Sequence, residues 1–137
     1  MKAILFCCGL SLSFCAASAE NPLDSALQHC LNREATTIGL SQCYDSAYQG
    51  WDKEMNVQYK NLLTKLNSEQ KVKLRSAQRD WLSYRDSWLA ATKAWYLAQQ
   101  GTMVNLSIGA QAVQLVKNQA LMLKSLDQGS CANPDDC

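Results

Sequence analysis

Proline, glycine and histidine are scarce in this sequence. The chain of 137 residues has two prolines, six glycines and one histidine. Proline interrupts helices and glycine weakens them, so their scarcity favours long helices joined by short turns. The single histidine, His29, leaves no recognisable Ser-His-Asp or Cys-His arrangement and no HExxH motif, and no glycine-rich phosphate loop is present.

Long hydrophobic runs are also missing, apart from one at the amino terminus. Lys2 is followed by apolar residues from Ala3 to Phe14 and then by the small residues Ala17-Ser18-Ala19. This pattern predicts a secretory signal peptide over residues 1–19, cleaved before Glu20. We therefore expect a periplasmic or secreted protein. Lipidation of Cys15 is disfavoured because a bulky phenylalanine precedes that cysteine.

Cysteines remain in an even number once the signal peptide is removed. The four are Cys30, Cys43, Cys131 and Cys137. In an oxidising compartment this set predicts two disulfides, and the short separations favour Cys30 with Cys43 and Cys131 with Cys137, among three possible pairings. No pair has the C-x-x-C spacing of a zinc site, so we expect neither a metal nor another cofactor.

Neither positive nor negative charge predominates in this sequence. The formal net charge is +1 for the whole chain and falls to zero without Lys2. A balanced charge gives no general attraction to nucleic acid or to an anionic membrane, so we expect no nucleic-acid partner. After the amino-terminal run no stretch is apolar for long enough to predict a membrane span. Residues 20–126 are predicted to form one domain, followed by a tail over residues 127–137.

Apolar residues recur at helical spacing throughout residues 20–126. Asn21 and Pro22 are typical of a helix start and predict a short first helix to about Arg33, and Ser68 is expected to cap a third helix after a second one. A fourth helix is predicted to follow a loop over Thr102 to Ser107. Short connections favour antiparallel neighbours, so the predicted fold class is all-α, an antiparallel up-and-down bundle of about four helices.

The most regular pattern lies in the third predicted helix, where apolar residues alternate steps of three and four. This spacing predicts a seam buried against another helix. The seam residues are Leu74, Ala77, Trp81, Tyr84, Trp88, Ala91, Trp95 and Ala98.

Two motifs in the second and third helices form a fairly specific combination. The first is W-D-x-E-M-N-x-x-Y from residue 51, and the second is A-Q-x-x-W-x-x-Y-R-D from residue 77. Together they resemble the LprI-type lysozyme-inhibitor family of small exported helical domains. The resemblance covers roughly residues 30–126 and implies structural roles for Trp51, Asp52, Asn56, Tyr59, Gln78, Trp81, Tyr84, Arg85 and Asp86.

The resemblance favours a non-catalytic binding protein over an enzyme. Asp80 and Asp86 each adjoin an arginine that keeps a carboxylate ionised, whereas a glycosidase needs one acid with a raised pKa. The implied partner is another protein, either lysozyme or a cell-wall hydrolase. The alternative is a periplasmic immunity or structural envelope protein that neutralises a delivered toxin. Peptidoglycan binding by Trp95 and Tyr96 is a further hypothesis.

Hydrogen-bonding and acidic groups near the ends of the helices are the candidate binding residues, because a rigid loop with such groups can enter an enzyme cleft. They lie in the predicted loop over Thr102 to Ser107 and in the tail. The residues are Asn105, Asn133, Asp135 and Asp136.

Overall fold

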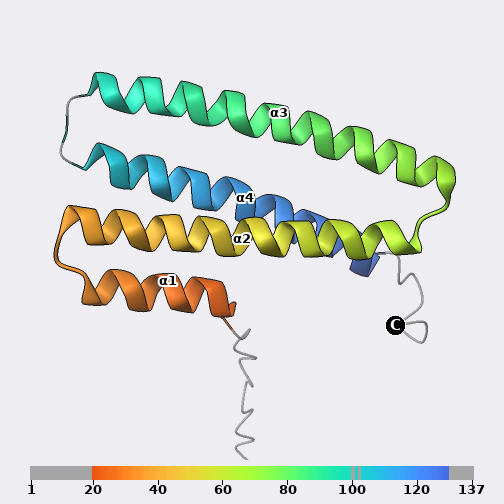
Figure 1. The fold of residues 1–137 in the computed structure, drawn as a ribbon, viewed down its shortest axis with the longest axis horizontal. Coiled ribbons are helices and arrows are strands. Elements are labelled where there is room, and N and C mark those ends of the chain that lie inside the picture. Colours follow the sequence, from red (N-terminus) through yellow and green to blue (C-terminus); the bar gives the residue numbers. More distant parts are fainter. Residues whose placement is uncertain (1–19, 100, 102, 130–137) are drawn as a thin grey trace, which may run out of the picture.

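The computed structural model describes residues 20–99, 101 and 103–129, and within these residues it contains four α-helices and no strand. Successive helices run in opposite directions (Figure 1). The predicted all-α up-and-down bundle is therefore confirmed. The expected signal peptide, and the candidate residues Asn133, Asp135 and Asp136, lie outside the described residues. The helices are α1 (Pro22–Arg33), α2 (Thr37–Lys65), α3 (Ser68–Ala98) and α4 (Val104–Gly129).

Side-chain caps fix the starts of the first three helices. The Asn21 side chain accepts a 2.9 Å hydrogen bond from the backbone N–H of Leu23, and Thr36 Oγ1 accepts one from Gly39. The cap of α3 is Asn67, whose side chain exchanges hydrogen bonds with Gln70 in a capping box. The expectation that Ser68 is the cap is wrong, because asparagine one residue earlier already satisfies the free N–H groups.

The fourth helix begins earlier than the sequence pattern predicted. Its first residue is Val104, and the backbone N–H of Ser107 already bonds to the carbonyl of Met103. The loop predicted over Thr102 to Ser107 is therefore wrong from Val104 onward. Leu106 is buried, and packing of this first-turn side chain favours an early start of the helix. Asn105 consequently lies in the first turn of α4 rather than in a loop.

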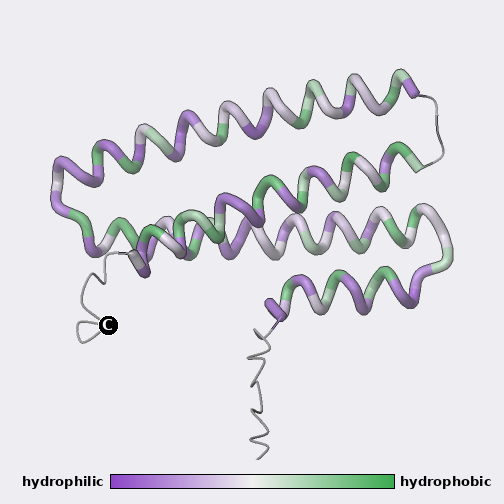
Figure 2. The backbone as a smooth tube through the Cα atoms, turned by 180° about the vertical axis from the view of Figure 1, so that it is seen from behind, coloured by the Kyte–Doolittle hydropathy of each residue, from purple (hydrophilic) through white to green (hydrophobic). Residues whose placement is uncertain are grey.

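Side chains of α2 and α4 form the hydrophobic core. Figure 2 shows that α4 is more hydrophobic along its length than α3. α1 packs on α2, and α3 packs on α4. Leu23 and Leu27 of α1 and Leu74 and Trp81 of α3 reach the core only partly buried. The core residues are Ala47, Trp51, Met55, Leu62, Val113, Val116, Ala120 and Leu123.

Glycine allows α4 to approach α2 closely near the end of the bundle. A Cβ added at Gly109 would lie 2.8 Å from Cβ of Tyr44, which is closer than real side chains approach. The missing side chain therefore sets the distance between the two helices that form the core.

The seam predicted on α3 is only partly buried, so the prediction that all its residues are hidden is wrong. Tyr84, Trp88 and Trp95 are 51%, 45% and 67% exposed, and Gln78 is the one buried residue of α3. Trp81 and Leu74 do contact the core. The side of α3 that faces the bundle is displaced by about one residue from the predicted seam, and it holds Leu74, Gln78, Trp81, Arg85, Leu89, Thr92 and Tyr96.

The displacement has a physical reason. Gln78 and Arg85, two polar residues on the inward side of α3, both find polar partners on neighbouring helices. The aromatic stripe and the inward stripe both recur at helical spacing, so periodicity alone does not distinguish them. Partners for buried polar groups decide which stripe faces inward.

A disulfide joins the two amino-terminal helices. Cys30 on α1 is bonded to Cys43 on α2, and their Cα atoms are 5.7 Å apart. This pairing is as expected from the sequence. Closing a loop of this length stabilises a fold by about 3 kcal/mol in the chain-entropy view. The bridge expected between Cys131 and Cys137 lies outside the described residues.

Candidate functional site

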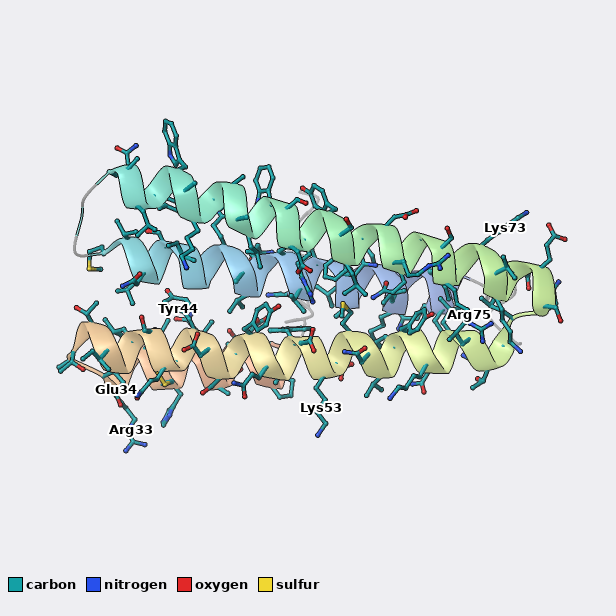
Figure 3. The ribbon with its side chains drawn as sticks, turned by 45° about the horizontal axis from the view of Figure 1, so that its top comes forward. Arg33, Glu34, Tyr44, Lys53, Lys73 and Arg75 are labelled. Atoms are coloured by element: carbon teal, nitrogen blue, oxygen red, sulfur yellow. A yellow bond between two sulfur atoms is a disulfide. The ribbon has the colours of Figure 1, made fainter. Side chains whose placement is uncertain are left out.

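The two sequence motifs face each other across the bundle. Residues of the first motif lie on α2, those of the second lie on α3, and α4 lies behind the space between these helices (Figure 3). Two hollows open along this side of the bundle. One is lined by α2 and α3, and the other by α2, α4 and Leu89 of α3. We call this region, from Ser41 to Tyr59 on α2 and from Val72 to Leu89 on α3, the α2–α3 groove.

Trp51, the first residue of the motif on α2, is part of the core. It is 1% exposed, and its indole Nε1 has no hydrogen-bond partner among the described residues. The ammonium group of Lys117 lies 5.5 Å from its ring centroid and also pairs with Asp24 at 2.6 Å. Trp51 therefore packs in the core between α2 and α4, and Lys117 links its ring to Asp24 of α1.

Gln78 is the buried polar residue of the motif on α3. Its Oε1 accepts a 2.9 Å hydrogen bond from Nε2 of Gln119 on α4, and its Nε2 lies 3.6 Å from Sδ of Met55 on α2. A buried amide needs such partners, because an unmade hydrogen bond is costly. Gln78 therefore holds α3 in one register against both core helices.

A charged cluster crosses the middle of the groove. Arg85 of α3 lies 3.6 Å from Oδ1 of Asp52 on α2 and 2.8 Å from Oδ1 of Asp86. Its guanidinium also lies 5.7 Å from the ring centroid of Trp81. Asn56 donates hydrogen bonds to the backbone and side chain of Asp52. The side chains of Arg85 and Asp52 are 18% and 36% exposed, so this pair is screened less than a fully exposed pair, whereas Asp86 is 68% exposed.

Tyr48 adjoins this cluster. Burial raises the pKa of the Tyr48 phenol above its ordinary value, and the carboxylates of Asp52 and Asp86 raise it further. The positive charge of Arg85 opposes this rise and lowers the pKa in part. Tyr48 therefore remains a neutral hydrogen-bonding group in the groove at every physiological pH.

One end of the groove is an open hollow that contains a carboxylate and an amide. Its volume is about 360 Å³. Asp45 on α2 and Asn105 on α4 are the exposed polar residues in its lining, and Tyr48 extends it toward the charged cluster. Gly109 lies in the wall where α4 approaches Tyr44. The structure thus brings Asn105 to the groove, but not through the loop that the sequence predicted.

The opposite end of the groove is basic. Arg75 and Arg79 of α3 and Tyr59 of α2 line a hollow of about 300 Å³. In Figure 3 Arg75 extends from α3 toward the end of α2. Both arginines are exposed, so the two ends of the groove differ in charge.

Sequence reasoning missed Tyr48, Asp45 and the two arginines. The first two fall at steps of three and four before Asp52, on the same side of α2. That spacing was a signal that could have found them, since a helix places such residues together. Two family-motif residues of α3, Tyr84 and Asp86, are exposed to solvent.

The described residues contain no group of three or more histidine, cysteine, aspartate or glutamate side chains that could hold a metal ion. In the same part of the chain, no helix is both long enough and apolar enough to cross a membrane.

Comparison with known proteins gives a family and a fold. Residues 30–123 match the family model described as lysozyme inhibitor LprI. The chain is also similar to an uncharacterised protein from Burkholderia thailandensis whose crystal structure is known, with 31% identity and a TM-score of 0.72. That match covers 79% of this chain and 54% of the other, so this chain spans about half the length of that protein. No curated protein matches the chain.

Proposed function

The chain belongs to the lysozyme inhibitor LprI family, and from this we propose that it is an exported, non-catalytic binding protein that inhibits lysozyme or another cell-wall hydrolase. The observation that carries the proposal is the family match over residues 30–123, which includes every motif residue of the α2–α3 groove. Export is supported by the signal-peptide pattern of residues 1–19 and by the disulfide between Cys30 and Cys43.

The arrangement of carboxylates supports binding rather than catalysis. Asp52 and Asp86 both contact Arg85, and Asp24 contacts Lys117. Each of these carboxylates is thus engaged by a neighbouring cation, whereas glycoside cleavage needs a pair of carboxyl groups that flank the scissile bond. These carboxylates are therefore suited to fixing helices and contacting a partner.

The proposed contact surface is the end of the α2–α3 groove that holds Asp45 and Asn105. An acidic group and an amide on two neighbouring helices can bond to the polar groups of an enzyme cleft with basic surroundings. The surface is rigid, because the disulfide at Cys43 and the close contact of Gly109 with Tyr44 fix α2 and α4 nearby. A preorganised surface loses little entropy on binding.

The experiment measures the rate at which lysozyme lyses a cell-wall suspension, with and without an equimolar amount of the purified protein. Lysozymes of several classes are used. We expect slower lysis with at least one of them. Asn105→Arg should relieve this inhibition by placing a bulky cation at the contact surface. Asn61→Arg is the matched control, because Asn61 is also an exposed helical asparagine but lines neither hollow of the groove.

Two results would count against the proposal. If no lysozyme class is inhibited, the immunity reading is favoured, and capture of a toxin by the protein becomes the next measurement. If inhibition occurs but Asn105→Arg and Asn61→Arg behave alike, inhibition stands and the assigned contact surface is wrong.

A further inference from the structure

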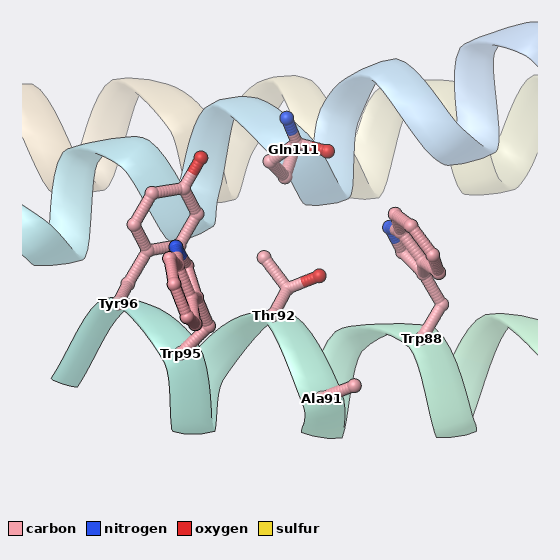
Figure 4. Close-up of a pocket in the computed structure, with 6 residues that line it drawn as sticks. All are labelled: Trp88, Ala91, Thr92, Trp95, Tyr96 and Gln111. Carbon is pink, nitrogen blue, oxygen red and sulfur yellow. The ribbon is translucent and has the colours of Figure 1, made fainter. Parts of the chain in front are cut away.

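A further hollow lies on another side of α3, between α3 and α4. Its volume is about 260 Å³, and α3 and α4 both contribute to it. Figure 4 shows Thr92 between the two tryptophans, with Gln111 facing them from α4. We call this hollow the α3–α4 pocket. Its lining residues are Trp88, Ala91, Thr92, Trp95, Tyr96 and Gln111.

Two indole rings in this pocket are open to solvent. Trp88 is 45% exposed and Trp95 is 67% exposed, and neither belongs to the hydrophobic core or packs against it. They are seven residues apart, which separates them by about 10 Å along the helix on nearly the same side. Large aromatic surfaces left bare in this way are typical of binding sites rather than of a folded interior.

The polar groups of the pocket are all uncharged. Thr92 and Tyr96 bring hydroxyl groups and Gln111 brings an amide, so the pocket offers both hydrogen-bond donors and acceptors. None of its lining residues is charged. A charged ligand would lose its hydration in this pocket without gaining an ion pair. The lining therefore matches a neutral ligand that combines apolar faces with many hydroxyl groups.

We propose that the α3–α4 pocket binds a neutral oligosaccharide of β-linked hexopyranose units. A pyranose ring has C–H groups on a flat face, which can pack against an indole, and hydroxyl groups around its edge, which can bond to Gln111, Thr92 and Tyr96. Two indoles about 10 Å apart along a helix can contact successive parts of one chain of sugars. The pocket is at the small end of ligand-pocket volumes, which fits one or two rings.

This proposal is independent of the proposed inhibition of lysozyme, because the α3–α4 pocket shares no lining residue with either hollow of the α2–α3 groove. A variant of Trp95 should bind sugar more weakly and keep any inhibition. A variant of Asn105 should show the reverse. Failure of one proposal can therefore be told from failure of the other.

The experiment titrates the full chain with chitotriose and, separately, with cellotriose, and follows binding by calorimetry and by tryptophan fluorescence. We expect at least one trisaccharide to bind with a dissociation constant of about 1 mM or tighter, as a shallow site allows. Emission should move to shorter wavelength as Trp95 loses contact with water. Trp88→Ala and Trp95→Ala should each weaken binding by about tenfold.

Leu97→Ala is the matched control, because Leu97 is 52% exposed on the same helix but does not line the pocket. It should leave binding unchanged. The proposal is overturned if neither trisaccharide binds, or if Leu97→Ala weakens binding as much as Trp95→Ala does. It is also overturned if sedimentation shows that the chain forms a dimer that Trp95→Ala dissociates, since the pocket is then covered by a second copy. Circular dichroism confirms that each variant is folded.

Discussion

Gln119 on α4 donates a 2.9 Å hydrogen bond to the buried Oε1 of Gln78 on α3. α3 otherwise meets the core through the partly buried side chains Leu74 and Trp81. Because α3 has so few buried apolar contacts, its position along α4 depends more on hydrogen bonds than the positions of the other helices do. The amide pair supplies that bond in a partly buried site, where a hydrogen bond is stronger than in water.

Gln78→Ala should therefore destabilise the protein by about 1 to 3 kcal/mol, because Gln119 loses its partner and Met55 loses a neighbour. Urea unfolding followed by circular dichroism measures the change. Gln42→Ala is the control, because Gln42 is an exposed glutamine of α2, and it should change stability by less than about 0.5 kcal/mol. Equal effects of the two substitutions would show that α3 does not depend on the amide pair.

Substitutions of two tryptophans distinguish the inward and outward stripes of α3. Trp81 packs against the core, whereas Trp95 is 67% exposed. Trp81→Ala should cost about 3 kcal/mol of unfolding free energy, and Trp95→Ala less than about 0.5 kcal/mol. Chemical unfolding of both variants measures the difference. A large loss for Trp95→Ala would mean that the predicted seam is buried after all, against a second copy or another part of the chain.

The helices could be predicted from the sequence, but the side of α3 that faces the core could not. The helices were predictable because the sparse proline and glycine, the Asn21-Pro22 start and the periodicity all indicated helices. The side of α3 that faces inward was not predictable, because the aromatic residues formed the more regular pattern and outweighed Gln78 and Arg85. The partners of those two polar residues, Gln119 and Asp52, lie 41 and 33 positions away in the chain, and local spacing carries no information about them.

The candidate site was predictable only in part. The motifs identified Asp52 and Arg85, which the fold brings to within 3.6 Å of each other. Asn105 was identified for the wrong reason, since the expected loop is the first turn of α4. Asp45 and Tyr48 were missed, because a groove between helices depends on how the helices are arranged, and that arrangement is set by contacts such as that of Gly109 with Tyr44.

Gly109→Ala should destabilise the protein although alanine is the better helix former. In an open helical site this change gains up to about 1 kcal/mol. Here the new Cβ would lie 2.8 Å from Cβ of Tyr44 and would push α4 away from α2, at a cost of about 1 to 3 kcal/mol. Gly129→Ala is the control, because no atom lies within 4 Å of the added Cβ there. A lower melting temperature for Gly109→Ala alone is the expected result, and a stabilised Gly109→Ala protein would contradict the close packing.

Tyr48 makes stability depend on pH in the alkaline range. Burial raises the pKa of its phenol in the folded protein above the ordinary value of 10.0, and Arg85 opposes this rise only in part. The unfolded chain therefore loses this proton at lower pH than the folded chain does. The contribution to stability is complete below about pH 10 and is lost as pH rises through the folded pKa.

Tyr48→Phe removes the group that titrates, so the variant should lose less stability than the natural protein between pH 9 and pH 11. The urea concentrations at which the two proteins are half unfolded, determined at several pH values, measure this difference. Titration of the lysines affects both proteins equally and therefore does not contribute to it. Tyr84→Phe is the matched control, since the Tyr84 side chain is 51% exposed, and it should follow the natural protein. If Tyr48→Phe and Tyr84→Phe give the same pH profile, Tyr48 does not carry the alkaline sensitivity and the groove is more open to water than its geometry indicates.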